Sequence, residues 1–159
     1  MKTIPVFAAM LLAAGLFLSG CNYEVPLTAK PTRKIDAQLI GDWVAVDKDS
    51  KEEEMMYVRK LDDVTYVVAM DKEIYRAFHS DFAGTAFLSV QDLNSADRLY
   101  LYLTYRLSPD GKQLSVLTVS TKVVPEETKG RSALQKLIKR QLTNPKLLNE
   151  PMEFTRKSR

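Results

Sequence analysis

The chain has 159 residues, of which 45% are hydrophobic and 27% are charged, and its formal net charge at pH 7 is +3. This length fits a single domain that is able to bury a real core. Cys21 is the only cysteine in the sequence, which excludes an intramolecular disulfide and a zinc site built from cysteines. The stability of the domain must therefore come from packing and hydrogen bonds.

The first twenty residues have the pattern of a signal peptide. Lys2 precedes an apolar run from Ile4 to Leu18 that is too short to span a membrane comfortably. The residues that follow resemble the bacterial lipobox, and they are Leu18, Ser19, Gly20 and Cys21. This resemblance implies that the Cys21 thiol accepts a diacylglyceryl group and that cleavage before Cys21 makes it the first residue of the mature protein.

An acylated cysteine predicts that the protein is anchored to a membrane rather than spanning it. The two or three acyl chains of a bacterial lipoprotein hold it at the bilayer for practical purposes permanently, because each buried CH₂ contributes about 0.8 kcal/mol. Asn22 follows the cysteine, whereas the resemblance implies that Asp at this position retains a lipoprotein in the inner membrane. We therefore expect the periplasmic face of the outer membrane, with the inner membrane as the alternative.

Residues 21–37 are expected to form the lipidated cysteine and a flexible tether. The stretch from Asn22 to Ala37 is mostly polar, contains Pro26 and Pro31, and has neither helical nor strand periodicity. We expect residues 38–159 to form a single β-rich domain.

Short β-favouring runs alternate with turn sequences from Trp43 to Thr121, which indicates antiparallel strands. In the clearest run, Leu101 and Leu103 share the face expected inside, and Tyr100 and Tyr102 share the other, which is half-exposed or lies under a helix. We expect a mainly β fold, an antiparallel meander that forms a small barrel or sandwich. The seven runs are Trp43–Val46, Met55–Leu61, Val64–Met70, Ile74–His79, Thr85–Gln91, Leu99–Leu107 and Leu114–Thr121.

One amphipathic helix is predicted over residues 132–143, with Ser132 as its N-cap and Gln135 completing a capping box. Three basic residues, Lys136, Lys139 and Arg140, fall on the side opposite the apolar face. The region from residue 122 to 159 holds 10 Lys and Arg against 4 Asp and Glu. We expect this basic face to turn toward an anionic membrane, and the alternative is an ordinary solvated face. A short final strand is predicted within residues 150–156.

Three stretches carry a resemblance to a known group. They are "LIGDWV" from Leu39, "FHSDFAGTAFLSVQ" from Phe78 and, after the helix, "EPMEFTR" from Glu150. They are similar to a group of small bacterial lipoproteins of uncharacterised function that have a lipocalin-like barrel. Gly41, Asp42 and Trp43 resemble the G-x-W triplet of lipocalins, and the resemblance implies a structural role for Trp43 as a plug at the barrel base.

Side-chain combinations that would indicate chemistry are scarce. His79 is the only histidine, and Asp81 lies two residues further on, which suggests a base with an orienting carboxylate or, alternatively, a structural histidine. The acidic run from Asp47 to Glu54 fails the EF-hand pattern, because Glu52 stands where a calcium loop needs glycine. No phosphate-loop, dinucleotide-binding or G-x-S-x-G motif occurs. We predict no catalytic residues, no metal site, no cofactor and no enzymatic activity.

The predicted function is that of a membrane-anchored envelope lipoprotein acting as an accessory or structural interaction module. The alternative is a lipocalin-like binder of a small apolar or amphiphilic ligand. We expect the membrane to be one partner, through the acyl anchor on Cys21, and we expect no binding of nucleic acid. An envelope protein partner and a small-molecule ligand are left open. We further expect that side chains fill the barrel and that the helix covers an opening.

Overall fold

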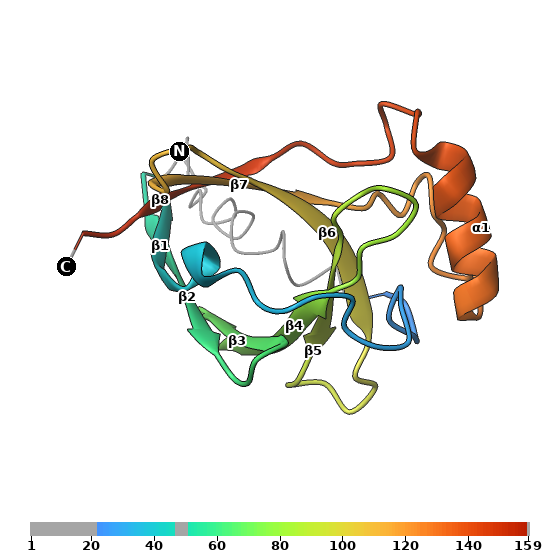
Figure 1. The fold of residues 1–159 in the computed structure, drawn as a ribbon, viewed down its shortest axis with the longest axis horizontal. Helices are drawn as coiled ribbons and strands as arrows, with labels where there is room; N and C mark the ends of the chain where they lie inside the picture. The colour runs from blue at the N-terminus through green and yellow to red at the C-terminus, as the bar shows by residue number, and fades with distance from the viewer. Residues whose placement is uncertain (1–21, 47–50, 159) are drawn as a thin grey trace, which may run out of the picture.

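The computed structural model describes residues 22–46 and 51–158, and its strands form one closed barrel (Figure 1). Within these residues, eight antiparallel strands follow one another around the barrel in chain order. They are β1 (Gly41–Val46), β2 (Glu53–Lys60), β3 (Thr65–Met70), β4 (Glu73–His79), β5 (Leu88–Asp92), β6 (Tyr100–Leu107), β7 (Gln113–Thr118) and β8 (Met152–Arg156). The predicted meander and its short final strand are confirmed.

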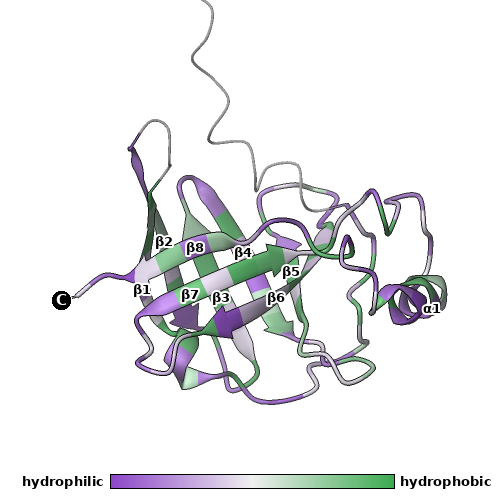
Figure 2. Cartoon of the chain, turned by 90° about the horizontal axis from the view of Figure 1, so that it is seen from above, coloured by the Kyte–Doolittle hydropathy of each residue, from purple (hydrophilic) through white to green (hydrophobic). Residues whose placement is uncertain are grey.

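Each strand turns alternate side chains into the barrel, because successive residues of a strand point to opposite faces. In β6, Leu101 and Leu103 join the apolar cluster inside the barrel, whereas Tyr100 and Tyr102 join a second cluster outside it. In Figure 2, hydrophobic (green) and hydrophilic (purple) residues both occur along single strands. The expected assignment of the two faces of this strand is confirmed.

The seam that closes the barrel is its shortest strand pairing. β1 pairs with β8 at two positions, Trp43 with Arg156 and Val44 with Thr155, whereas β1 pairs with β2 at six positions. Closure is nevertheless complete, because β8 also pairs with β7 at four positions.

One end of the barrel is closed by the short helix η1 (Ala37–Leu39), which lies within the ring of strands in Figure 1. Leu39 is buried in the inner cluster, and its carbonyl accepts a hydrogen bond of 3.0 Å from Nε1 of the fully buried Trp43. The Arg156 guanidinium covers the indole ring and donates to the carbonyls of Ile40 and Gly111 at 2.9 and 2.7 Å and to that of Gln38. Trp43 therefore closes the barrel base, as expected.

Gly41 is required beside this contact for two reasons. Its φ of 155° lies in a region that residues with a side chain rarely adopt. A Cβ atom at this position would also lie 2.3 Å from Nη1 of Arg156. The close approach of Arg156 to the start of β1 thus depends on a residue without a side chain.

The segment before the barrel packs against the barrel wall, although the sequence predicts a flexible tether from residue 21 to 37. Tyr23 and Leu27 are fully buried in the outer cluster. The Leu27 amide donates to Oγ of Ser89 at 3.0 Å, and the Leu27 carbonyl accepts from the Gln135 side chain at 2.8 Å. The tether prediction is wrong for residues 22–36, because a few apolar side chains hold an otherwise polar segment in place.

The helix α1 (Arg131–Gln141) lies beside the barrel wall and not across an opening (Figure 1). Its Leu134 and Ile138 pack in the outer cluster with Tyr23, Tyr100 and Tyr102, so the two strand tyrosines lie under the helix. The expectation that the helix covers a barrel opening is therefore wrong. The outer cluster is a second core between α1, the N-terminal segment and the wall.

The start of α1 also differs from the prediction. The helix begins at Arg131, and its N-cap is Gly130, which has a φ of 80° and provides no side-chain cap. Ser132 already lies inside the first turn, so the predicted capping box does not form. The predicted amphipathic character is correct, since Lys136, Lys139 and Arg140 are exposed and the apolar face is buried.

Candidate functional site

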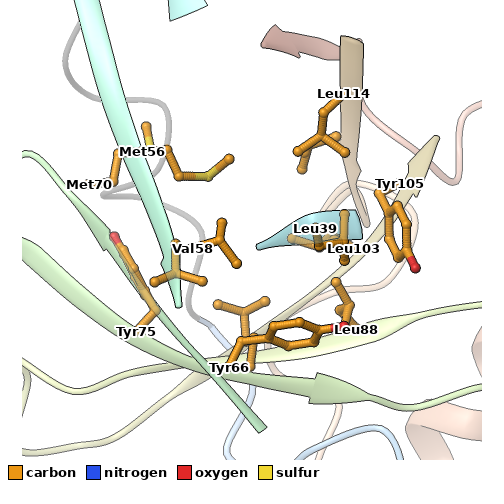
Figure 3. Close-up of a pocket in the computed structure, with 14 residues that line it drawn as sticks. Leu39, Met56, Val58, Tyr66, Met70, Tyr75, Leu88, Leu103, Tyr105 and Leu114 are labelled. Atoms are coloured by element: carbon orange, nitrogen blue, oxygen red, sulfur yellow. The ribbon is translucent and has the colours of Figure 1, made fainter. Parts of the chain in front are cut away.

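The barrel interior encloses a cavity of about 70 Å³ (Figure 3). Its walls come from η1 and six strands, and apolar and aromatic side chains point into it from all around. Met56 and Met70 line one part of the wall, and Leu103 and Leu114 line another. The exposed surface of the cavity lining is apolar and consists of hydrocarbon, thioether and ring atoms.

The cavity is small for a ligand site. Pockets for drug-sized molecules have volumes of about 300 to 1,000 Å³, several times the volume found here. A single water occupies about 30 Å³ of liquid, so this space matches a few heavy atoms at most. The side chains of the barrel therefore fill most of its interior, which is the arrangement expected from the bulky residues of the strands.

A polar cluster lies at the edge of the cavity, where the N-terminal segment meets the barrel. Tyr66 and Tyr105 line the cavity and also reach this cluster. The Tyr66 hydroxyl lies 2.9 Å from Nε2 of His79 and accepts a hydrogen bond from the Asp36 amide. The Tyr105 hydroxyl donates to Oδ2 of Asp36 at 3.3 Å. The cluster thus links β3, β4 and β6 to the residue that caps η1.

His79 is fully buried within this cluster, and its electrostatic setting favours the neutral ring. Burial, together with the nearby Arg33 guanidinium, lowers the pKa of His79 to about 4. Because the Tyr66 oxygen accepts from the Asp36 amide, its own proton is available to Nε2 of His79. Nδ1 of the same ring is buried and has no hydrogen-bond partner among the described residues.

Asp81 does not orient His79 as an acid–base pair would require. Its Oδ2 forms an ion pair of 2.9 Å with Nε of Arg33, and its amide donates to the Thr32 hydroxyl at 2.8 Å. The Thr32 amide in turn donates to the His79 carbonyl at 2.9 Å. Asp81 and the His79 carbonyl thus hold the N-terminal segment at the end of β4. This fits the interpretation of His79 as a structural residue.

The remaining predicted site residues fall into two groups. The lipidation site Cys21 and the lipobox residues Leu18, Ser19 and Gly20 lie outside the described residues, as do Asp47 and Asp49. Lys136, Lys139 and Arg140 form the exposed face of α1, and their role at a membrane stays a prediction. The structure does not bring these basic residues to the polar cluster.

Sequence reasoning missed Arg33 and Asp36, because both lie in the presumed tether. The available signal was the apolar residues of that stretch, since Tyr23, Leu27 and Ile35 all pack against one of the two clusters. Two buried residues and one partly buried residue in a polar segment indicate that the segment packs against the barrel, but they form no periodic pattern.

In the described ranges, no group of three or more His, Cys, Asp or Glu side chains is arranged to hold a metal ion. Among the helices of these ranges, none combines the length and the apolar character that crossing a bilayer demands. The fold and the site define a small, closed, eight-stranded antiparallel β-barrel with a nearly filled interior. The chain matches no protein-family model, and comparison with curated proteins and with solved structures gives no match either.

Proposed function

We propose that the protein is a lipid-anchored envelope lipoprotein that acts as an accessory or structural interaction module. Its anchor is the acylated Cys21, and its location is the periplasmic face of the outer membrane. The support for the anchor is the signal-peptide pattern and the lipobox-like residues that end at Cys21.

The observation that carries the proposed role is the nearly filled barrel interior. A cavity of about 70 Å³ leaves little room for cargo, so the barrel serves as a rigid scaffold whose outer surface meets partners. The arrangement of His79 supports a role without catalysis. The imidazole is buried and neutral, and Asp81, the carboxylate expected to orient it, is engaged by Arg33.

The anchor is tested by metabolic labelling with a palmitate analogue. The unchanged protein takes up the label, and Cys21→Ser does not, because the thioether forms on the thiol before cleavage. Ser19→Thr is a matched control that changes a hydroxyl residue of the same stretch and leaves the thiol in place. Label retained on the Cys21→Ser protein contradicts the proposal.

The role of the barrel is tested by native mass spectrometry of the lipid-free domain purified from the periplasm. A scaffold gives the mass of the polypeptide alone or of a complex with another protein. A small molecule that accompanies the polypeptide in stoichiometric amount contradicts the scaffold role.

The cavity lining favours one second candidate, a binder of a small apolar or amphiphilic ligand. Met56 and Met70 are flexible side chains that can adjust to a guest. Ala77 also lines the cavity, so Ala77→Leu would fill it. A binder loses its ligand in this variant, whereas a scaffold keeps its function. Ala69→Leu on β3 is the control, because Ala69 does not line the cavity.

A further inference from the structure

We propose that the acyl anchor of Cys21 joins the barrel without a spacer, so that one fixed edge of the barrel rests on the phospholipid headgroups. This inference rests on the proposed acylation of Cys21. It goes further, because acylation alone leaves the orientation of the domain open.

The backbone is fixed to the barrel from the residue after the anchor onward. The amides of Asn22 and Tyr23 both donate to the Tyr100 carbonyl, at 2.9 and 3.0 Å. The Tyr100 amide donates back to the Tyr23 carbonyl at 2.7 Å, which makes an antiparallel bridge at the start of β6. Asn22 and Tyr23 therefore continue the barrel surface.

The side chain of Tyr23 locks this attachment. Its ring is stacked on that of Tyr102, with centroids 4.6 Å apart and planes 6° apart. The Tyr23 hydroxyl donates to the Val124 carbonyl at 2.7 Å, and the Tyr102 hydroxyl donates to the Val25 carbonyl at 2.5 Å. The two rings are almost completely buried, so freeing the segment would expose both.

Covalent geometry then sets the distance between anchor and barrel. Consecutive Cα atoms lie about 3.8 Å apart, so acyl chains on Cys21 begin within one residue of the fixed backbone. A flexible coil of about 16 residues would allow roughly 20 to 24 Å instead. The start of β6 must therefore stay close to the headgroups, and the domain cannot turn freely about its anchor.

The surface that this geometry brings to the bilayer is acidic, and we call it the anchor face. It is an open cleft of about 510 Å³. Four carboxylates and one ammonium group line it, and Lys129 pairs with Glu24 at 2.5 Å. Charges act over about 8 Å at physiological salt, so headgroups at contact sense this face and anionic lipid repels it. The lining residues are Asn22, Glu24, Asp97, Leu99, Glu126, Glu127 and Lys129.

The test uses the full acylated chain in vesicles of zwitterionic phospholipid. Since Cys21 is the only native cysteine, an introduced cysteine takes a fluorophore specifically. Asp97→Cys labels the anchor face, and Lys112→Cys labels the turn at the other end of β6; both residues are exposed. A quencher on the lipid headgroups acts only at contact range. We expect several-fold stronger quenching at position 97 than at position 112.

A flexible Gly/Ser insertion of the same length as the presumed tether, placed between Asn22 and Tyr23, is the matched control. It should remove the difference between the two labels, because the barrel then turns freely. Anionic lipid added to the vesicles should weaken quenching at position 97 in the chain without the insertion. Equal quenching at both positions, a difference that survives the insertion, or quenching at position 97 that rises with anionic lipid overturns the inference. Failure of the acylation itself is seen separately, as an unmodified N-terminal peptide and no protein on the vesicles.

Discussion

The guanidinium carbon of Arg156 lies 4.2 Å from the centroid of the Trp43 ring, and the two residues are also paired in register across the seam. The same side chain donates to the carbonyls of Ile40 and Gly111. One arginine on β8 thus holds the start of β1 and the turn between β6 and β7. The closed end of the barrel depends on residues that are far apart in the chain.

Trp43→Ala should lower the free energy of unfolding by about 3 to 5 kcal/mol, because the removal of a fully buried indole leaves a large cavity. Denaturant unfolding of the lipid-free domain measures the change. Trp43→Phe should cost less, since a ring still fills part of the space. A loss under about 1 kcal/mol for Trp43→Ala would contradict the role of the indole as a plug.

Arg156→Lys should cost about 2 to 4 kcal/mol of unfolding free energy, because an ammonium group cannot reach the same carbonyls and cover the indole at once. Arg106→Lys on β6 is the matched control, since Arg106 is exposed, and it should stay within about 0.5 kcal/mol. Equal effects of the two substitutions would show that the Arg156 contacts contribute nothing specific.

The stability of the protein should fall as the pH drops from about 6.5 to about 4. The pKa of His79 is lowered to about 4 in the folded state, so below pH 6.5 the unfolded chain binds a proton that the folded chain does not. The full loss is about 3 kcal/mol. His79→Gln should remove the part of this loss that comes from His79. The difference between the pH dependences of the unfolding free energy of the two proteins then separates the His79 contribution from that of the carboxylates.

The same pKa is accessible directly, because His79 is the only histidine. Its ring protons give a single set of histidine signals in a proton NMR titration. We expect a midpoint well below 6.5, and a midpoint at or above 6.5 would contradict the burial of a neutral ring.

Tyr66→Phe should cost about 1 to 3 kcal/mol, because it leaves the Asp36 amide and Nε2 of His79 without their partner. Tyr57→Phe removes the same hydroxyl from a residue on β2 that is 41% exposed, and it should have almost no effect. Thermal unfolding of the two variants at neutral pH makes the comparison. A similar melting temperature for both would mean that the polar cluster adds no stability.

The sequence also predicts that the basic face of α1 binds anionic lipid, and this face competes with the acidic anchor face as the surface that meets the bilayer. Replacement of Lys136, Lys139 and Arg140 by Glu should reduce sedimentation of the unlipidated domain with anionic vesicles, since each cation near the surface contributes about 1 kcal/mol. Lys112→Glu is the control for a general effect of charge. Equal binding to anionic and zwitterionic vesicles, or binding unchanged by the triple replacement, would remove the helix from any membrane role.

The strands could be predicted from the sequence because period-2 alternation and turn residues are local signals. The predicted run Leu99–Leu107 contains the whole of β6, and Ile74–His79 differs from β4 by one residue. The run that starts at Thr85 begins too early, because Thr85 closes a tight bridge with Phe82 before β5 starts at Leu88. Boundaries depend on such tertiary pairings, which no local pattern contains.

The N-terminal segment and the polar cluster could not be predicted in the same way. Tyr23 is buried by Tyr102 and Val124, which lie about eighty and a hundred positions further along the chain. His79 meets Tyr66 only once the barrel has formed, and Asp36 reaches them from a segment without periodicity. Contacts of this kind form only in the closed barrel, and they produce no periodic pattern in the sequence.

The two-position pairing of β1 with β8 gives the barrel an uneven resistance to opening. Local unfolding separates first the elements that share the fewest contacts, and here these are the two edges joined at the seam. Opened there, the molecule becomes a curved sheet of the same strand order whose free β1 edge offers its backbone groups to any extended segment nearby. Amide protons that bond across the seam, such as that of Lys157, which donates to the Asp42 carbonyl at 2.8 Å, should then exchange with solvent deuterium before those between β3 and β4, which pair at six positions.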